Sequence, residues 1–430
     1  MATTLHKRHP QIRSKAGSLV AALDIGSTKV ACLIGRTDPL APTGFAFLGG
    51  GRQQSRGFDC GRITDIEALE RSIRLAVEDA EREAGERIER VVLGVAGPHL
   101  QSELVDVDMS LGGREITMRD VRKLWAHALS KQASRDRELL AAFPVGYCID
   151  DQEDVSEPVG MIGDLLTATM HLVSAPKSLI SNLRECVHRA HLEIEQIVPS
   201  AIASAAGSLI EDEVENGAVC IDFGGAATSV SVFQNGVPAW TAMVRVGGGH
   251  VTRDLAQGIG TTFAAAERVK TLYGTADLDG PGLAERIEAP RLGDDGRLKS
   301  GRMARADLAA MIHPRIEETF ELVGRLIEES PVQNMPQRIV LTGGASQLPG
   351  VRDVSTNCLN RPLRLGRPTS ADILTEKFAN PAFSTAAGLI SYQLRGYTEA
   401  LRAGAALSAT GGTTRGRLVR RVLDWIRDNF

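Results

Sequence analysis

SLVAALDIGSTKV, residues 18–30, joins an apolar run to a short polar turn and leads into a second apolar run, ACLI. Apolar runs of this length on either side of a glycine-containing turn are typical of buried strands, so the stretch predicts a β-hairpin. Glycine at the turn lets backbone N–H groups approach an anion without a Cβ in the way. Asp24, at the end of the first strand, is a candidate partner of hydrated Mg²⁺. The candidate phosphate ligands are Gly26, Ser27, Thr28 and Lys29. A tight hairpin with a purely structural role is the alternative for this stretch alone.

The same design recurs two hundred residues later, in residues 217–232, GAVCIDFGGAATSVSV. A third strand, in residues 338–346, RIVLTGGAS, runs straight into a glycine pair. Two Asp-bearing hairpins that face one another can hold a polyphosphate and its metal from both sides, and a strand that ends in two glycines lets a flat base approach the backbone. The second hairpin adds Asp222 as a candidate metal partner. Its candidate phosphate ligands are Gly224, Gly225, Ala226 and Thr228, and the third strand contributes Gly343 and Gly344.

The composition indicates a soluble protein of two or more domains, because 430 residues with 43% apolar and 24% charged side chains can bury sizeable cores. The net charge of −4 points to no particular partner, and the body of the chain has no basic run of the kind that nucleic-acid binding requires. The six cysteines lack C-x-x-C spacing, which predicts reduced core residues of a cytosolic protein. No apolar segment reaches the roughly 18 residues needed to cross a bilayer.

Patterns between the hairpins predict the remaining elements. Asp65 is expected to cap a helix over 66–83, and residues 91–173 are expected to form a small α+β domain of strand, helix, strand and strand. Three glycines at 247–249 open a predicted helix, whose N-terminus, at Gly248, is available to a phosphate or ribose. The next predicted helix, over 262–272, carries Glu267 and Lys270 on one face, and a surface ion pair is the alternative interpretation of these two.

These features together resemble the FtsA family of bacterial cell-division proteins, within the actin, Hsp70 and sugar-kinase superfamily of two-lobed ATPases. Residues 19–394 can be placed on that pattern throughout. The marks of the resemblance, besides the three glycine turns and the small domain after Val91, are SRGFD at 55–59 with Gly61, Ile63 and Asp65, Pro314-Arg315, LTGGA at 341–345, STAAGL at 384–389 and a short amphipathic helix at the C-terminus.

The resemblance implies an α/β fold: a two-lobed actin-like ATPase with an inserted α+β domain, called 1C, and a C-terminal amphipathic helix. The expected boundaries are 1–17 (basic tail, without the apolar core of a signal peptide), 18–90 (subdomain 1A), 91–173 (inserted subdomain 1C), 174–205 (1A continued), 206–247 (2A), 248–304 (2B), 305–372 (2A and 2B continued), 373–395 (1A continued), 396–414 (flexible linker) and 415–430 (amphipathic helix).

The resemblance also implies ATP and Mg²⁺ as cofactors. Asp24 and Asp222 then approach the metal through water, the two hairpin turns bind the phosphates, and Gly248, Glu267, Lys270, Gly343 and Gly344 contact the adenosine. Arg315 and Glu318 correspond to the surface that grips the C-terminal peptide of the tubulin-like FtsZ, although an intrahelical ion pair is the alternative. Further implied partners are other copies of the chain in protofilaments and other divisome proteins, at the cytoplasmic face of the inner membrane at the division site.

Two departures from the family pattern affect the expected chemistry. Ala226 stands where the family usually has Gly, which costs about 1 kcal/mol if that residue needs a positive φ. Around Pro199 the chain lacks the Gln or Glu that orients the attacking water in active actin-like ATPases, so hydrolysis is expected to be slow. The alternative functions are an actin-like adaptor of pilus assembly and, with less support, a sugar-kinase-type phosphotransferase.

The C-terminus reads as a linker followed by a membrane-binding helix. Residues 395–414 are rich in Gly, Ala, Ser and Thr, and residues 415–430, RGRLVRRVLDWIRDNF, place their apolar side chains within an arc of about 160°. An apolar face with Trp, an arginine-rich polar face and a length too short to span predict a helix in the membrane interface. A helix docked on the protein itself is the alternative. The predicted anchor residues are Leu418, Val419, Val422, Leu423, Trp425, Ile426 and Phe430.

Overall fold

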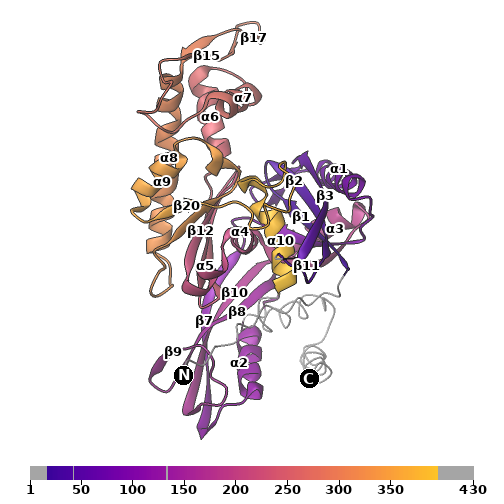
Figure 1. The fold of residues 1–430 in the computed structure, drawn as a ribbon, viewed down its shortest axis with the longest axis vertical. Coiled ribbons are helices and arrows are strands. Elements are labelled where there is room, and N and C mark those ends of the chain that lie inside the picture. Colours follow the sequence, from indigo (N-terminus) through magenta and orange to yellow (C-terminus); the bar gives the residue numbers. More distant parts are fainter. Residues whose placement is uncertain (1–16, 42, 132–133, 396–430) are drawn as a thin grey trace.

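The computed structural model describes residues 17–41, 43–131 and 134–395 of the chain. Figure 1 shows an elongated molecule in which two sheet-centred lobes lie side by side. A helical extension of the second lobe forms one end, and a domain inserted in the first lobe forms the other. The two-lobed α/β fold that the family resemblance implied is confirmed. The predicted basic tail, linker and terminal helix lie outside the described residues.

Lobe 1 is built on a five-stranded sheet with the order β11-β6-β1-β2-β3. Its strands are β1 (Leu19–Ile25), β2 (Lys29–Thr37), β3 (Phe45–Gln54), β6 (Arg90–Val95) and β11 (Glu193–Pro199). Side chains of β1 alternate between two cores: Leu23 packs with α1 (Ile66–Ala84) and α3 (Lys177–Arg189), and Ala22 packs with α4 (Ser200–Ser208) and α10 (Ser384–Arg395). Because both faces are covered, the strand is almost continuously apolar. Asp65 caps α1 as predicted, accepting the Ala68 N–H at 3.0 Å.

Lobe 2 repeats the same sheet topology, with the order β14-β13-β12-β19-β20. Its strands are β12 (Ala218–Phe223), β13 (Thr228–Gln234), β14 (Val237–Val244), β19 (Ile339–Thr342) and β20 (Leu363–Leu365). In both sheets a β-meander of three antiparallel strands continues through its first strand into two parallel strands. The repeated sequence motif therefore forms the equivalent hairpin in each sheet, β1–β2 in lobe 1 and β12–β13 in lobe 2.

Two helices, α4 and α10, cross between the lobes. An ideal Cβ at Gly388 of α10 would lie 1.7 Å from the Ala203 carbonyl oxygen, and one at Gly207 of α4 would lie 2.1 Å from the Ser384 carbonyl oxygen. Real Cβ atoms do not come so close, so the crossing requires glycine in both helices. Both helices contribute side chains to a core that reaches the sheets of both lobes.

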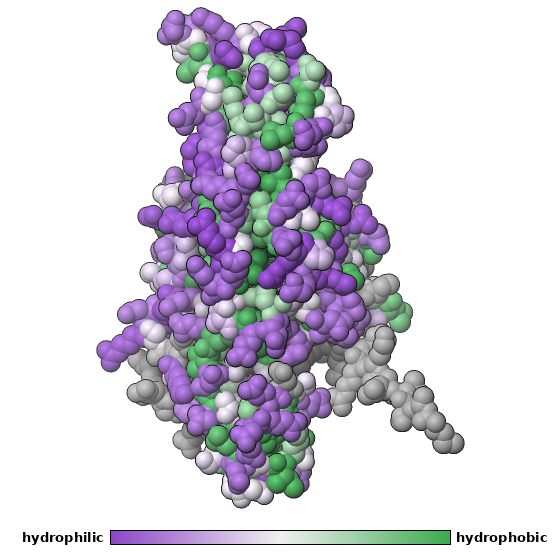
Figure 2. Space-filling model, turned by 90° about the vertical axis from the view of Figure 1, so that its left-hand side faces the viewer, coloured by the Kyte–Doolittle hydropathy of each residue, from purple (hydrophilic) through white to green (hydrophobic). Residues whose placement is uncertain are grey.

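The outer part of lobe 2 contains three helices and two small ribbons. They are α6 (Gly248–Ile259), α7 (Phe263–Tyr273), α8 (Arg305–Glu328), the pair β15 (Arg286–Glu288) and β18 (Arg302–Ala304), and the pair β16 (Arg291–Leu292) and β17 (Leu298–Lys299). The connection after β19 adds the short helix η1 (Gly344–Gln347) and α9 (Val351–Leu359). Figure 2 shows that this side of the molecule is largely hydrophilic, with hydrophobic side chains in small groups.

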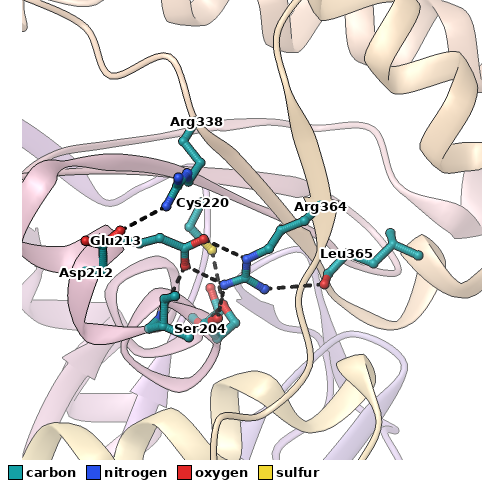
Figure 3. Close-up of polar contacts among 9 residues, drawn as sticks. Ser204, Asp212, Glu213, Cys220, Arg338, Arg364 and Leu365 are labelled. Carbon is teal, nitrogen blue, oxygen red and sulfur yellow. Dashed lines mark hydrogen bonds and ion pairs between the residues drawn. The ribbon is translucent and has the colours of Figure 1, made fainter.

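An ion pair with a buried carboxylate joins the start of lobe 2 to β20. Arg364 donates to the Glu213 carboxylate of α5 (Glu211–Asn216), with Nε 2.7 Å from Oε1, and to the Ser208 carbonyl at 2.8 Å (Figure 3). Glu213 is only 1% exposed, and its carboxylate accepts hydrogen bonds from this guanidinium and from the Ile210 N–H. The pair fixes the end of α4 against the edge of the second sheet.

The inserted domain is a four-stranded sheet with the order β7-β10-β8-β9, covered on one face by α2 (Met118–Lys131). Its strands are β7 (Gln101–Glu115), β8 (Arg137–Ile149), β9 (Gln152–Val155) and β10 (Ile162–Pro176). The predicted start at residue 91 is wrong, because Arg90–Val95 pairs with β1 and β11 and so belongs to lobe 1. Within the described residues, no helix is long and apolar enough to cross a membrane.

Candidate functional site

The two Asp-bearing turns meet between the lobes. Each is closed by the same backbone bond: the Gly26 N–H donates to the Lys29 carbonyl at 3.0 Å, and the Gly224 N–H to the Ala227 carbonyl at 3.1 Å. An ideal Cβ at Gly225 would lie 1.9 Å from Thr28 Oγ1, so the turns touch and the contact requires glycine. The prediction that the two hairpins face one another is confirmed.

Three charged side chains are brought together at this contact. Asp24 and Lys29 come from lobe 1 and Asp222 from lobe 2, and each interacts electrostatically with the other two. Burial raises the pKa of Asp24 to about 6; Lys29 opposes this rise and Asp222 adds to it. Burial likewise raises the pKa of Asp222 and lowers that of Lys29. A cation placed here would favour both carboxylates in their charged form.

The start of α10 completes the site, which the sequence did not indicate. Thr385 Oγ1 donates to Asp222 Oδ2 at 3.2 Å, and hydrogen bonds from Thr385 and Ser204 oppose the rise in the pKa of Asp222. Lys29 Nζ lies 5.0 Å from the centre of the Phe383 ring. STAAGL marked the family resemblance but gave no sign of this contact, because 160 residues separate the two partners.

The second turn is supported from α6. The N–H groups of Gly248 and Gly249 donate to the carbonyls of Gly224 and Gly225, at 2.9 and 2.7 Å. Thr228 is fully buried, and its hydroxyl donates to the Val246 carbonyl at 2.7 Å. This hydroxyl therefore stabilises the turn, and the phosphate-binding role of Thr228 stays a prediction.

Ala226 carries no backbone strain in this structure. It is not among the residues with positive φ, so the expected cost of replacing glycine there does not arise. The glycine that does need a positive φ is Gly343, at +92°, where a Cβ would lie 2.3 Å from Asp222 Oδ1.

The predicted adenosine residues also converge. Lys270 Nζ donates to the Gly248 carbonyl at 3.0 Å, to Thr252 Oγ1 at 2.7 Å and to Glu267 Oε2 at 2.7 Å. An ideal Cβ at Gly248 would lie 2.8 Å from the Cβ of Ala345, which places the start of α6 beside the Gly343–Gly344 turn. The alternative ion pair between Glu267 and Lys270 is present, and Thr252, which the sequence analysis did not single out, joins it.

The segment 55–61 holds the first turn from outside. The Ser55 N–H donates to the Thr28 carbonyl at 3.0 Å, and the Cys60 N–H donates to Ser27 Oγ at 2.9 Å. Gly61 has a φ of +77°, and a Cβ there would lie 2.4 Å from Gly97 Cα. SRGFD therefore supports the turn and does not itself line it.

Arg315 and Glu318 lie on α8, apart from these turns. Arg315 forms the intrahelical pair with Glu318, and its Nε and Nη2 also donate to Asp254 of α6, at 2.5 and 3.1 Å. These two carboxylates raise the pKa of Arg315. The predicted membrane-anchor residues, 418–430, lie outside the described part of the chain.

The donor set suits a metal–polyphosphate complex better than a directly bound metal. Among the described residues no group of three or more His, Cys, Asp or Glu side chains could hold a metal ion by itself. Two acidic groups beside a lysine and two glycine turns instead match an ion that keeps several waters and takes its other ligands from phosphates. The buried carboxylates with raised pKa values are the observation that fits such a cation.

Comparisons with known proteins agree with this geometry. The model of the family "Cell division protein FtsA" matches residues 219–388, and that of the "SHS2 domain inserted in FTSA" matches residues 97–174, in agreement with an insert that begins after β6. Among solved structures, a PilM–PilN type IV pilus biogenesis complex has a TM-score of 0.62 at 16% identity, covering 87% of this chain and 98% of that chain. MreB5 of Spiroplasma citri bound to ADP has a TM-score of 0.51 at 12% identity, covering 87% of this chain and 95% of that chain.

Curated relatives match at higher identity. The cell division protein FtsA of Agrobacterium fabrum is 38% identical over 97% of this chain and 96% of its own length. FtsA of Pseudomonas aeruginosa is 32% identical over 97% and 99%, and FtsA of Escherichia coli K12 is 31% identical over 97% and 100%. The likeness to the pilus protein is one of fold alone. With these identities over nearly the whole length of both partners, and with its two-lobed actin-like fold, this chain belongs to the FtsA family of cell-division proteins.

Proposed function

We propose that this FtsA-family protein binds ATP with Mg²⁺ between its lobes, assembles into actin-like protofilaments and tethers the FtsZ ring to the cytoplasmic membrane. The observation that carries the nucleotide site is the meeting of Asp24, Lys29 and Asp222 at two touching glycine turns. Asp24 is 8% exposed, and desolvation raises the pKa values of both aspartates although Lys29 opposes the rise, so a bound cation would favour their charged forms.

In this proposal each lobe supplies half of the phosphate site. Backbone N–H groups of the two turns and the Lys29 ammonium bind the phosphates, while the two aspartates accept hydrogen bonds from waters on Mg²⁺. The bound metal neutralises phosphate charge. Lys270 and Glu267 hold the start of α6 in place beside the Gly343–Gly344 turn, where the adenosine would lie. Residues 197–200, IVPS, which lead into α4, include no carboxylate or carboxamide to orient a water, so we expect slow turnover.

Calorimetry of Mg-ATP binding to the full-length chain tests this site. Asp222→Asn keeps the shape of the side chain and its hydrogen bond from Thr385 but removes the charge that faces the metal, so we expect a loss of affinity of tenfold or more, corresponding to about 1.4 kcal/mol. Asp212→Asn, an exposed change in the same lobe, is the matched control and leaves binding unchanged. Equal affinity of the parent and Asp222→Asn contradicts the proposed site.

The FtsZ-binding surface is proposed at Arg315 and Glu318. In the structure Arg315 already holds two carboxylates, Asp254 and Glu318, so an acidic peptide residue must compete with them. Arg315→Glu replaces that attraction with repulsion and is expected to weaken binding of an FtsZ tail peptide in fluorescence anisotropy, while Mg-ATP binding is kept. Arg325→Glu, on the same helix, is the control. Normal peptide binding by Arg315→Glu rules out this surface.

The membrane half of the proposal rests on the sequence of residues 415–430. An apolar face of several side chains and about 1 kcal/mol for each arginine near an anionic leaflet give reversible binding, which strengthens when a filament presents many copies. Co-sedimentation with anionic liposomes is expected to fall for Trp425→Glu and to stay unchanged for Asp424→Glu on the polar face. Sedimentation of Trp425→Glu equal to that of the parent excludes this helix as the anchor.

A further inference from the structure

A buried histidine lies at the base of the inserted domain. His171 of β10 is 0% exposed, and its ring stacks on Phe143 of β8 with the ring centres 5.9 Å apart. Its Nδ1 lies 2.9 Å from the Pro238 carbonyl oxygen and its Nε2 2.8 Å from Ser102 Oγ. Both ring nitrogens therefore have a polar partner inside the protein.

The donor of each bond follows from the partners. A carbonyl only accepts, so His171 Nδ1 carries the hydrogen and Nε2 of the neutral ring accepts the Ser102 hydroxyl. Ser102 Oγ in turn accepts the Thr241 N–H at 3.0 Å. His171 and Ser102 belong to the insert, whereas Pro238 and Thr241 belong to β14. This closed network therefore joins the insert to lobe 2, although the chain enters and leaves the insert from lobe 1.

Lobe 1 holds the insert by separate contacts. Arg184 of α3 donates both of its terminal nitrogens to the Glu138 carboxylate of β8, at 2.9 and 2.6 Å. Arg137 of β8 donates to the His99 carbonyl at 2.9 Å, in the segment that leads from β6 into the insert. The insert is thus attached to both lobes, and a change in the angle between the lobes must strain or move at least one of these attachments.

The strand that meets the insert also ends at the second glycine turn. Two residues after the end of β14, the Val246 carbonyl accepts the Thr228 hydroxyl. Shortly after it, the N–H groups of Gly248 and Gly249 donate to the carbonyls of the turn. Five residues, or roughly 17 Å of extended chain, therefore separate Thr241 of the His171 network from Val246 at the proposed phosphate site.

We propose that the inserted domain is a brace between the lobes and that the His171–Ser102 network on β14 transmits ligand binding at the glycine turns to the inserted sheet. This inference rests on the proposed nucleotide site. Coupling of this kind is reciprocal, so a partner that binds the insert in only one of its orientations also changes the affinity of the chain for nucleotide. The orientation of the insert therefore depends on the angle between the two lobes.

Hydrogen exchange of the full-length chain, with and without Mg-ATP, tests the brace. In the parent we expect nucleotide to slow exchange at the 224–228 turn and to change exchange in β14 and in the insert strands β7 and β10. Ser102→Ala removes the hydroxyl at the centre of the network, so the change in β7 and β10 is expected to disappear while protection of the turn remains. Thr169→Ala, which removes a hydroxyl bonded to Asp106 on the same two strands, is the matched control and keeps the change.

A second variant guards against unfolding of the insert. Asn235→Gly removes the side-chain amide that contacts the Val145 carbonyl across the same interface, and glycine suits the φ of +51° there, so the response of the insert is expected to weaken without loss of folding. A response that is the same in the parent, Ser102→Ala and Asn235→Gly overturns the brace. In the parent, protection of the turn without any change in the insert also overturns it. No protection of the turn overturns the nucleotide site and the brace together.

Discussion

Replacing Gly388 by alanine tests the close crossing of α4 and α10. The new Cβ would lie 1.7 Å from the Ala203 carbonyl oxygen, whereas carbon–oxygen contacts in proteins are about 3.3 Å, so the helices must separate by about 1.5 Å. Overpacking of this kind costs about 1–3 kcal/mol and sometimes more, and the better helix propensity of alanine returns at most about 1 kcal/mol. We therefore expect the free energy of unfolding to fall by about 2 kcal/mol or more.

Gly324→Ala provides the matched control. This residue also lies inside a helix, α8, but its ideal Cβ meets only Leu359 Cδ2 at 3.5 Å, which is an ordinary contact. Here no steric clash opposes the better helix propensity of alanine, so the free energy of unfolding is expected to rise by up to about 1 kcal/mol. Thermal unfolding followed by circular dichroism measures both variants, and the two shifts should have opposite signs. An increase in Tm for Gly388→Ala equal to that for Gly324→Ala would refute the tight crossing.

Three further predictions follow from the site and its supports. Burial raises the pKa of Asp24 to about 6, so its carboxyl is neutral below that pH, and calorimetry should show Mg-ATP affinity falling about tenfold per pH unit there. Without nucleotide, the neutral carboxyl stabilises the folded state, and this contribution to the free energy of unfolding is lost as the pH rises from about 4 through 6. Arg364→Met leaves the Glu213 charge buried and unpaired and should cost about 3 kcal/mol or more in urea unfolding, with much of the loss recovered when Glu213→Gln is added. Gly225→Ala should weaken Mg-ATP binding by forcing the turns apart at Thr28, and Thr28→Ala should partly restore binding if that contact is the cause.

The sequence predicted the two hairpins because the chemistry of each is local. An apolar run, an aspartate and a glycine turn are adjacent in the chain, and the structure adds the identical hydrogen bond that closes each turn. Helix ends were also predictable where a capping residue such as Asp65 marks them. Repetition of the motif predicted two hairpins that face one another, and the family resemblance implied two lobes, which the two sheets of the same topology confirm.

Contacts between distant segments were not predictable in the same way. The strand Gln101–Glu115 was missed because most of its side chains are at least partly exposed, so its apolar residues give little sign of a buried face. The pairing of Arg315 with Asp254 joins two helices, and only the intrahelical partner, Glu318, could be expected from spacing. The hydrogen bond of Thr228 was not predictable for a related reason, since the Val246 carbonyl that accepts it is eighteen residues away.

The electrostatics of the site and the packing of α4 against α10 both depend on the distance between the two lobes. Asp24 and Lys29 are fixed to one sheet and Asp222 to the other, so the energy of this charge cluster depends on the distance between the lobes. That distance is controlled where α4 and α10 cross, because glycine at the crossing removes the side chains that would otherwise hold the helices apart. In the proposed function, a cation between the lobes therefore favours the short distance that the glycines make sterically accessible, and without it Asp24 and Asp222 repel one another.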